Sequence, residues 1–215
     1  MSASLRIGLA GAQLEALPVD VVVVGCFVDE RPLRGLASRA DWRSVGALSQ
    51  LLRDGSFRGD VGEAALIVGA RGLDAPRLLL LGLGECATLD SDRIRDWGIE
   101  ALSRCRALSS KRVAIALLPA ARLSPREQSV ALVAAALRVS EAAPEHPASD
   151  FEVWLAVLAE DRNATAAALH ELSPRLPANV QLLESGPEPK GPRAALLRQP
   201  AAPWGVHQAP STPYR

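Results

Sequence analysis

The chain has 215 residues, 48% of them apolar, and its 24 basic residues balance its 24 acidic residues. This apolar content indicates a folded globular protein rather than a disordered chain. The balanced charge supplies no general attraction to nucleic acid or to a membrane surface. No stretch approaches the length of an apolar membrane span, and the N-terminus lacks the pattern of a signal peptide. We therefore expect a cytoplasmic protein without nucleic-acid or membrane partners.

The three cysteines, Cys26, Cys86 and Cys105, are widely spaced and form no CxxC or Cys/His pattern. A structural zinc site needs ligands at short, repeated spacings. We therefore expect free thiols in a reducing compartment, and neither a metal nor another cofactor.

Strands and helices alternate in the first half of the chain. Apolar runs at 5–9 and 19–27 indicate strands, and the second run, rich in valine, is apolar enough to be covered on both faces. A helical spacing over 40–53 places five apolar residues on one face, namely Trp42, Val45, Leu48, Leu51 and Leu52. Two further apolar runs, at 64–69 and 77–81, flank a turn sequence and predict a hairpin.

The same alternation continues in the second half. An amphipathic helix is predicted over 93–108, with its inward residues being Ile94, Trp97, Ala101, Leu102 and Cys105. A capping box at Ser124–Glu127 starts a helix that reaches about residue 140. The remaining predictions are strands at 112–118, 151–158 and 180–183, a helix at 163–172 and a loop at 144–149.

The domain organisation follows from a change of composition at residue 186, after which seven prolines interrupt any periodicity. We predict a folded domain over 1–185 and an extended tail over 186–215. The alternating strands and helices predict an α/β protein, a three-layer α/β/α sandwich whose sheet is mixed because of the hairpin.

Several segments, in order, resemble the N-terminal domain of the leucine aminopeptidase (cytosol aminopeptidase) family. They are the strand Val21–Val24, the helix end Leu51–Gly55, the segment Phe57–Glu63 and the strand end Leu81–Glu85. The resemblance spans roughly residues 3–160. It implies a fold similar to macro domains and a role in packing against other domains and subunits.

The same resemblance bears on catalysis. In that family a separate C-terminal domain holds two metal ions, and its Asn-Thr-Asp-Ala-Glu-Gly-Arg stretch has no counterpart in these 215 residues. The resemblance therefore implies a non-catalytic module for oligomerisation or protein interaction, and not an enzyme. An active aminopeptidase is the least favoured alternative.

A second alternative is a macro-type site for ADP-ribose or a nucleotide. Gly82, Gly84 and Glu85 lie in a G-x-G-x-x-A sequence after a predicted strand, and Asp29 follows the strand at 19–27. Such glycines let backbone N–H groups approach a pyrophosphate at a helix N-terminus. The next helix signal, however, begins only near Thr88 or Asp90, so a purely structural turn also remains open.

The tail carries the remaining candidate residues, the apolar side chains of Leu196, Leu197, Trp204 and Tyr214. Aromatic side chains in extended segments often anchor into a partner's groove. The tail is therefore interpreted in one of two ways. Either it docks on a second copy of the chain or on another protein, such as a full-length aminopeptidase, or it is a terminus without a docking role.

Overall fold

The computed structural model describes residues 4–11, 13–119, 123–142, 150–183 and 186. The predicted loop at 144–149 and the four tail residues Leu196, Leu197, Trp204 and Tyr214 lie outside the described residues. The proposed domain boundary near 185 therefore stays a prediction.

Seven strands form one sheet in the order β3-β4-β2-β5-β6-β1-β7. Their bounds are Leu5–Ala10 (β1), Val21–Cys26 (β2), Ala64–Val68 (β3), Arg77–Gly82 (β4), Arg112–Ala116 (β5), Phe151–Ala156 (β6) and Val180–Leu183 (β7). Neighbouring strands are parallel except for β3 and β4, which form an antiparallel hairpin with Leu66 opposite Leu79. The predicted mixed sheet is confirmed.

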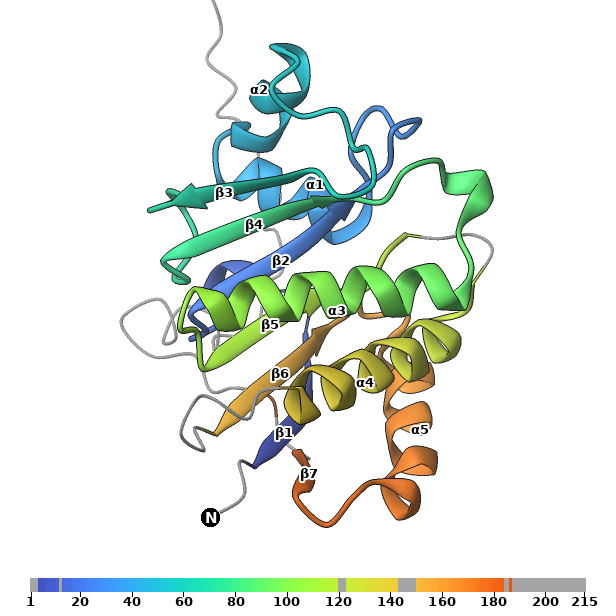
Figure 1. Cartoon of the computed structure of the whole chain (residues 1–215). Coiled ribbons are helices and arrows are strands. Elements are labelled where there is room, and N and C mark those ends of the chain that lie inside the picture. Colours follow the sequence, from blue (N-terminus) through green and yellow to red (C-terminus); the bar gives the residue numbers. More distant parts are fainter. Residues whose placement is uncertain (1–3, 12, 120–122, 143–149, 184–185, 187–215) are drawn as a thin grey trace, which may run out of the picture.

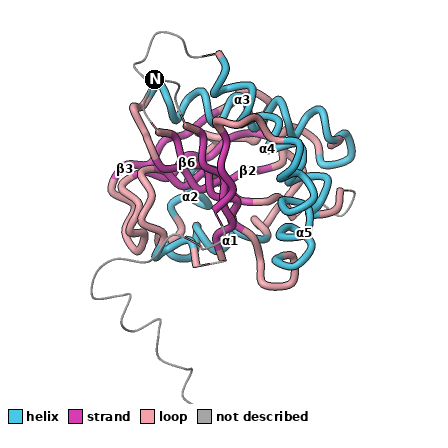
Figure 2. The backbone as a smooth tube through the Cα atoms, turned by 90° about the horizontal axis from the view of Figure 1, so that it is seen from below, coloured by secondary structure: helices cyan, strands magenta, loops and turns pink. Residues whose placement is uncertain are grey.

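Helices cover both faces of this sheet (Figures 1 and 2). The bounds are Gly35–Arg43 (α1), Ala47–Arg53 (α2), Ser91–Ala107 (α3), Pro125–Glu141 (α4) and Arg162–Leu172 (α5). Short 3-10 turns lie at Leu14–Ala16 (η1), Cys86–Thr88 (η2) and Ser173–Arg175 (η3). In Figure 1, α3, α4 and α5 lie on one side of the sheet and α1 on the other. The three-layer α/β/α prediction is confirmed.

The valines of β2 supply the centre of the core on both faces. Val21 and Val23 belong to the apolar cluster beneath α3 and α4, whereas Val22 and Val24 belong to the cluster beneath α1. All four side chains are completely buried. Successive strand residues point to opposite faces, so this run without alternation is what a doubly covered strand requires.

The predicted helix over 40–53 is wrong as a single element. α1 ends at Arg43 and α2 begins at Ala47, because Val45 and Gly46 adopt positive φ angles of 60° and 78° that cannot continue a right-handed helix. Leu48 is fully buried as predicted, but Trp42 and Val45 are 72% and 81% exposed. Because the break redirects the chain, Leu48 on α2 faces the core, whereas Trp42 and Val45 before it face solvent.

The other long helices match their predictions. All five residues predicted to face inward on α3 are buried. Asp90 caps this helix, with its carboxylate accepting a hydrogen bond from the backbone N–H of Arg93, and the Ser124–Glu127 capping box starts α4. α3 and α4 pack closely at Gly98, where an added Cβ would lie 2.9 Å from both Ala135 and Leu132.

Candidate functional site

The loops after β2 and β4 meet at the carboxyl end of the sheet, where ligands of open α/β folds usually bind. The carboxylate of Asp29 accepts a hydrogen bond from the backbone N–H of Cys86 at 3.0 Å. The N–H of Val28 donates to the carbonyl of Gly84 at 2.9 Å. The structure thus brings the predicted ligand residue Asp29 next to Gly84 and the exposed Glu85.

The glycines of this loop serve contacts inside the protein. The N–H of Gly82 donates to the carbonyl of Glu63 at 2.9 Å, and the N–H of Gly84 donates to the carbonyl of Gly59 at 2.8 Å. A Cβ at position 82 would lie 1.9 Å from the carbonyl oxygen of Asp60. A phosphate at this turn would compete with these carbonyls for the same N–H groups, so ligand binding by Gly82, Gly84, Glu85 and Asp29 remains a prediction.

Glu63 is a residue at this edge that the sequence did not single out. Its carboxylate accepts the N–H groups of Arg58, Gly59 and Asp60 at 2.8, 2.7 and 3.1 Å. Burial alone would raise the pKa of Glu63, but these three N–H groups hold that pKa below its ordinary value. Successive N–H groups of this kind form anion-binding concavities, and here a carboxylate of the protein itself fills one.

Burial shifts the pKa of two titratable groups next to this loop. Burial raises the pKa of the Cys26 thiol to about 11, against the opposing charge of Arg31. Burial also raises the pKa of Glu30. The reactive species of cysteine is the thiolate, and so Cys26 is a core residue rather than a nucleophile at neutral pH.

A second region of interest is a cavity of about 410 Å³ at the carboxyl ends of β1 and β6. Its polar lining includes Arg39 and Arg162, and its apolar lining includes Leu17, Val157 and Leu158. Arg162 is exposed, and one of its guanidinium nitrogens lies 4.0 Å from where a Cβ on Gly11 would be. The sequence did not predict this cavity, because its lining residues come from separate segments between Gly11 and Gly186 and share no motif.

Arg39 is held in that cavity wall by Glu15. The two side chains form a bidentate pair, with nitrogen–oxygen distances of 3.0 and 2.8 Å, and Arg43 contacts the same carboxylate at 2.6 Å. Burial alone would raise the pKa of Glu15, but the hydrogen bonds from Arg39 and the charges of Arg39 and Arg43 lower it overall. One carboxylate therefore faces two guanidinium groups, and the wall keeps a net positive charge.

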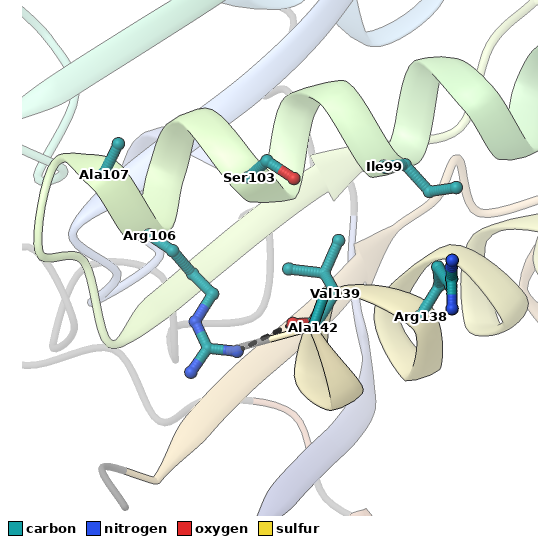
Figure 3. A pocket seen from close by; sticks show the side chains of 7 residues that line it. All are labelled: Ile99, Ser103, Arg106, Ala107, Arg138, Val139 and Ala142. Carbon is teal, nitrogen blue, oxygen red and sulfur yellow. Dashed lines mark hydrogen bonds between the residues drawn. The ribbon is translucent and has the colours of Figure 1, made fainter. Parts of the chain in front are cut away.

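A third cavity, of about 350 Å³, lies between the C-terminal halves of α3 and α4 (Figure 3). Its lining is Ile99, Ser103, Arg106, Ala107, Arg138, Val139 and Ala142. The guanidinium of Arg106 donates to the carbonyl of Val139 at 3.0 Å and lies over the ring of Phe151. Arg106 thus joins α3 to α4 and β6 and already has partners within the fold.

Groups that could bind a metal are scattered in the described part of the chain. No three His, Cys, Asp or Glu side chains gather there in an arrangement that could hold an ion. His170 is exposed on α5, and the other two histidines, His146 and His207, lie outside the described residues. None of the helices in this part of the chain has the length and apolar character to cross a bilayer.

Exposed apolar side chains gather on and around β3. Val61, Leu66 and Val68 are 62%, 42% and 72% exposed, and β3 is the outermost strand of the sheet. Trp42 and Val45 add further exposed apolar surface at the break between α1 and α2.

Solved structures of two kinds share this fold. A tomato leucine aminopeptidase point mutant superposes with a TM-score of 0.57 at 17% identity, over 83% of this chain and 40% of that one. A macrodomain of Oceanobacillus iheyensis with ADP superposes with a TM-score of 0.58 at 11% identity, over 76% of this chain and 89% of that one. At these low identities the structural likeness shows only that the folds are similar. The fold is macro-domain-like, as the resemblance to the aminopeptidase N-terminal domain implied.

Sequence comparison identifies the family. A probable cytosol aminopeptidase of Cupriavidus necator is 34% identical over 116 residues, which are 54% of this chain and 22% of that relative. The chain thus matches only about a fifth of the length of this relative. Residues 23–143, more than half of the chain, match the family described as "Cytosol aminopeptidase family, N-terminal domain". The chain therefore belongs to the cytosol aminopeptidase family, through the N-terminal domain of that family.

Proposed function

We propose that this chain is a non-catalytic module that acts in oligomerisation or protein interaction. The observation that carries the proposal is the apolar face of β3, where Leu66 and Val68 lie two residues apart on the same face and are 42% and 72% exposed. Contiguous apolar surface on a folded domain marks an interaction site far more often than scattered single residues do. A domain that resembles the N-terminal part of a larger enzyme is suited to such a role.

The side chains that would be needed for nucleophilic catalysis support the non-catalytic part of the proposal. Cys26 and Cys105 are buried, and burial raises the pKa of their thiols to about 11 and about 12. His170, the histidine of the described residues, is exposed on α5, and within those residues no hydrogen bond joins it to a cysteine or serine side chain. A nucleophile and its base must lie within hydrogen-bond reach.

Sedimentation velocity of the purified chain tests the proposal directly. We expect a concentration-dependent increase in sedimentation coefficient at micromolar protein, together with no release of p-nitroaniline from leucine p-nitroanilide in the presence of Mn²⁺ or Zn²⁺. Hydrolysis by material free of contaminating peptidase would contradict the non-catalytic role. A strictly monomeric chain that also fails to bind a full-length aminopeptidase in co-sedimentation would contradict the interaction role.

The alternative function is binding of ADP-ribose or a nucleotide, and the cavity beside β1 and β6 favours it. Arg39 and Arg162 give the lining of this cavity two guanidinium groups, and Arg39 is paired with Glu15, which Arg43 also contacts. Guanidinium groups suit the recognition of phosphates. The macrodomain of O. iheyensis that shares the fold has ADP in its structure.

Calorimetry with ADP-ribose and ADP separates this alternative from the interaction module. If the alternative holds, Arg162→Ala weakens binding at least about tenfold, whereas the control Arg95→Ala, which removes an exposed ion pair with Asp92 on α3, leaves it unchanged. Absence of heat at millimolar ligand removes the alternative and leaves the interaction module intact.

A further inference from the structure

We propose that β3 pairs with β3 of a second copy of this chain, in antiparallel orientation, and so joins two sheets into one. The inference rests on the proposed interaction function and names its partner and its surface. β3 is the edge strand of the sheet, with β4 as its neighbour on the inner side. In Figure 1, α3 crosses in front of strands nearer the middle of the sheet and leaves the near face of β3 uncovered, whereas Ala65 and Ile67 on the other face pack against the cluster beneath α1.

The edge of β3 has none of the usual features that prevent pairing. Proteins commonly protect an edge strand with lysine, proline, a bulge or an inward-pointing charge. β3 has the sequence Ala-Ala-Leu-Ile-Val and pairs with β4 in an uninterrupted register from Ala64 to Val68. The strand therefore offers a regular, uncharged edge to solvent.

The hydrogen bonds to the neighbouring strand show which residues of β3 face outward. The carbonyl of Glu63 accepts from the N–H of Gly82, and the N–H of Gly69 donates to the carbonyl of Pro76. Bonded and non-bonded positions alternate in an antiparallel ladder, so the intervening odd-numbered residues bond to β4. Ala64, Leu66 and Val68 consequently direct their N–H and C=O groups towards the free edge.

This alternation suits a two-fold axis at Leu66. A two-fold axis sets Leu66 opposite Leu66 of the second copy and Ala64 opposite Val68, so that each outward residue meets an outward residue. The three pairs can form about six hydrogen bonds between the copies. The same pairs bring together the apolar side chains of Leu66 and Val68, which are now 42% and 72% exposed.

The charges on either side of β3 favour antiparallel over parallel pairing. Asp60 and Glu63, with Arg58 before them, precede the strand and make that end acidic. Arg71 and Asp74 lie in the turn after the strand, and Arg77 lies opposite Val68, so that end is basic overall. Antiparallel pairing brings the acidic end of one strand towards the basic end of the other, whereas parallel pairing sets like charges beside each other. An isologous two-fold interface, in which the same patch serves both subunits, is also the commonest arrangement of homo-oligomers.

A charged substitution at the edge is the first test, measured by sedimentation velocity on the full chain. Val68→Lys places a lysine at each end of the paired segment, and we expect it to raise the dimer dissociation constant at least about tenfold. The control is Val130→Lys, the same change at a 41% exposed position on α4, and we expect it to dimerise like the parent. Circular dichroism melts confirm that both variants are folded.

A cysteine on the proposed axis is the second test. Leu66→Cys, made in a Cys86→Ser background because Cys86 is only half-buried whereas Cys26 and Cys105 are buried, should form a disulfide-linked dimer on mild oxidation. Opposite residues in such a pair have Cα atoms about 5.5 Å apart, within the range of a disulfide. Val130→Cys in the same background is the control and should remain unlinked.

The outcomes distinguish this inference from the proposed function. If the parent dimerises but Val68→Lys does not dissociate it and Leu66→Cys does not cross-link, the β3 interface is wrong and the interaction module stands. If Leu196→Asp with Trp204→Ala dissociates the dimer and Val68→Lys does not, the tail is the contact surface and the β3 interface is again wrong. A parent that stays monomeric throughout overturns self-association altogether.

Discussion

Glu15 is a nearly buried acidic side chain with two cationic partners. Its carboxylate is 7% exposed and contacts both Arg39 and Arg43. We expect Glu15→Gln to lower the free energy of unfolding by about 1–3 kcal/mol at pH 7, because the change leaves two half-buried guanidinium groups without their counter-charge. Urea unfolding measures this loss, and Glu100→Gln, which breaks the surface pair with Arg104, should cost under about 0.5 kcal/mol.

The same residue predicts a pH dependence. Because the pKa of Glu15 is lower in the folded protein than in the unfolded chain, its stabilising effect is complete above the ordinary glutamate pKa. That effect is lost as the pH falls through the lower, folded value. The stability difference between the parent and Glu15→Gln should therefore shrink as the pH is lowered from about 5 to 3. A difference that stays constant over this range would contradict the assigned role of the carboxylate.

The sequence could predict the positions of candidate-site residues that directly follow a predicted strand. Asp29 and Gly84 come after two strands that proved to be parallel neighbours, so their meeting at the carboxyl end follows from the fold. The role of Glu63 and the cavity of Arg39 and Arg162 were not foreseeable. Both depend on how loops and helices distant in the chain are folded back, and neither leaves a spacing pattern in the sequence.

At the level of elements, the break between α1 and α2 makes a prediction about backbone strain. Val45 is 81% exposed and has a φ of 60°, a conformation that β-branched residues rarely adopt. Val45→Asn should raise the free energy of unfolding by about 0.5–1 kcal/mol, because asparagine tolerates this region better. The same change at Val130, within α4, should not stabilise the protein. Urea unfolding of both variants tests the difference.

This break also explains the one helix that the sequence mispredicted. The spacing of Trp42, Val45 and Leu48 fits a helical face, and glycine at 46 is tolerated inside helices at a modest cost. Periodicity cannot reveal a left-handed pair of residues, because it reports side chains rather than backbone angles. The doubly covered strand β2 was predictable for the opposite reason, since its four valines are fully buried on two faces.

The contact between α3 and α4 depends on Gly98, which lies under Ala135 and Leu132. Gly98→Val should destabilise the protein by about 1–3 kcal/mol, because the added carbons overpack a site with no free space. At Ser103, an exposed position of the same helix beside the cavity between α3 and α4, a change to Val adds a β-branched residue without this clash and should cost well under 1 kcal/mol. If both variants lose the same free energy of unfolding, the cost of valine at position 98 comes from its low helix propensity and not from overpacking.

For the whole molecule, self-association links stability to concentration. A dimer that must dissociate before or during unfolding gains stability by mass action, and so its melting temperature depends on protein concentration. For a chain of this size, a tenfold rise in concentration should raise the melting temperature of the parent by about 1–3 °C. The measurement needs only thermal melts at several concentrations, and it reports on assembly in solution without any label.

The variants of the edge strand give this measurement its control. Val68→Lys removes the proposed pairing at β3, so its melting temperature should be independent of concentration and should equal that of the parent at high dilution. Val130→Lys, with the same charge added on α4, should keep the slope of the parent. A parent whose melting temperature is constant over two decades of concentration would leave the apolar edge of β3 without a second copy to cover it.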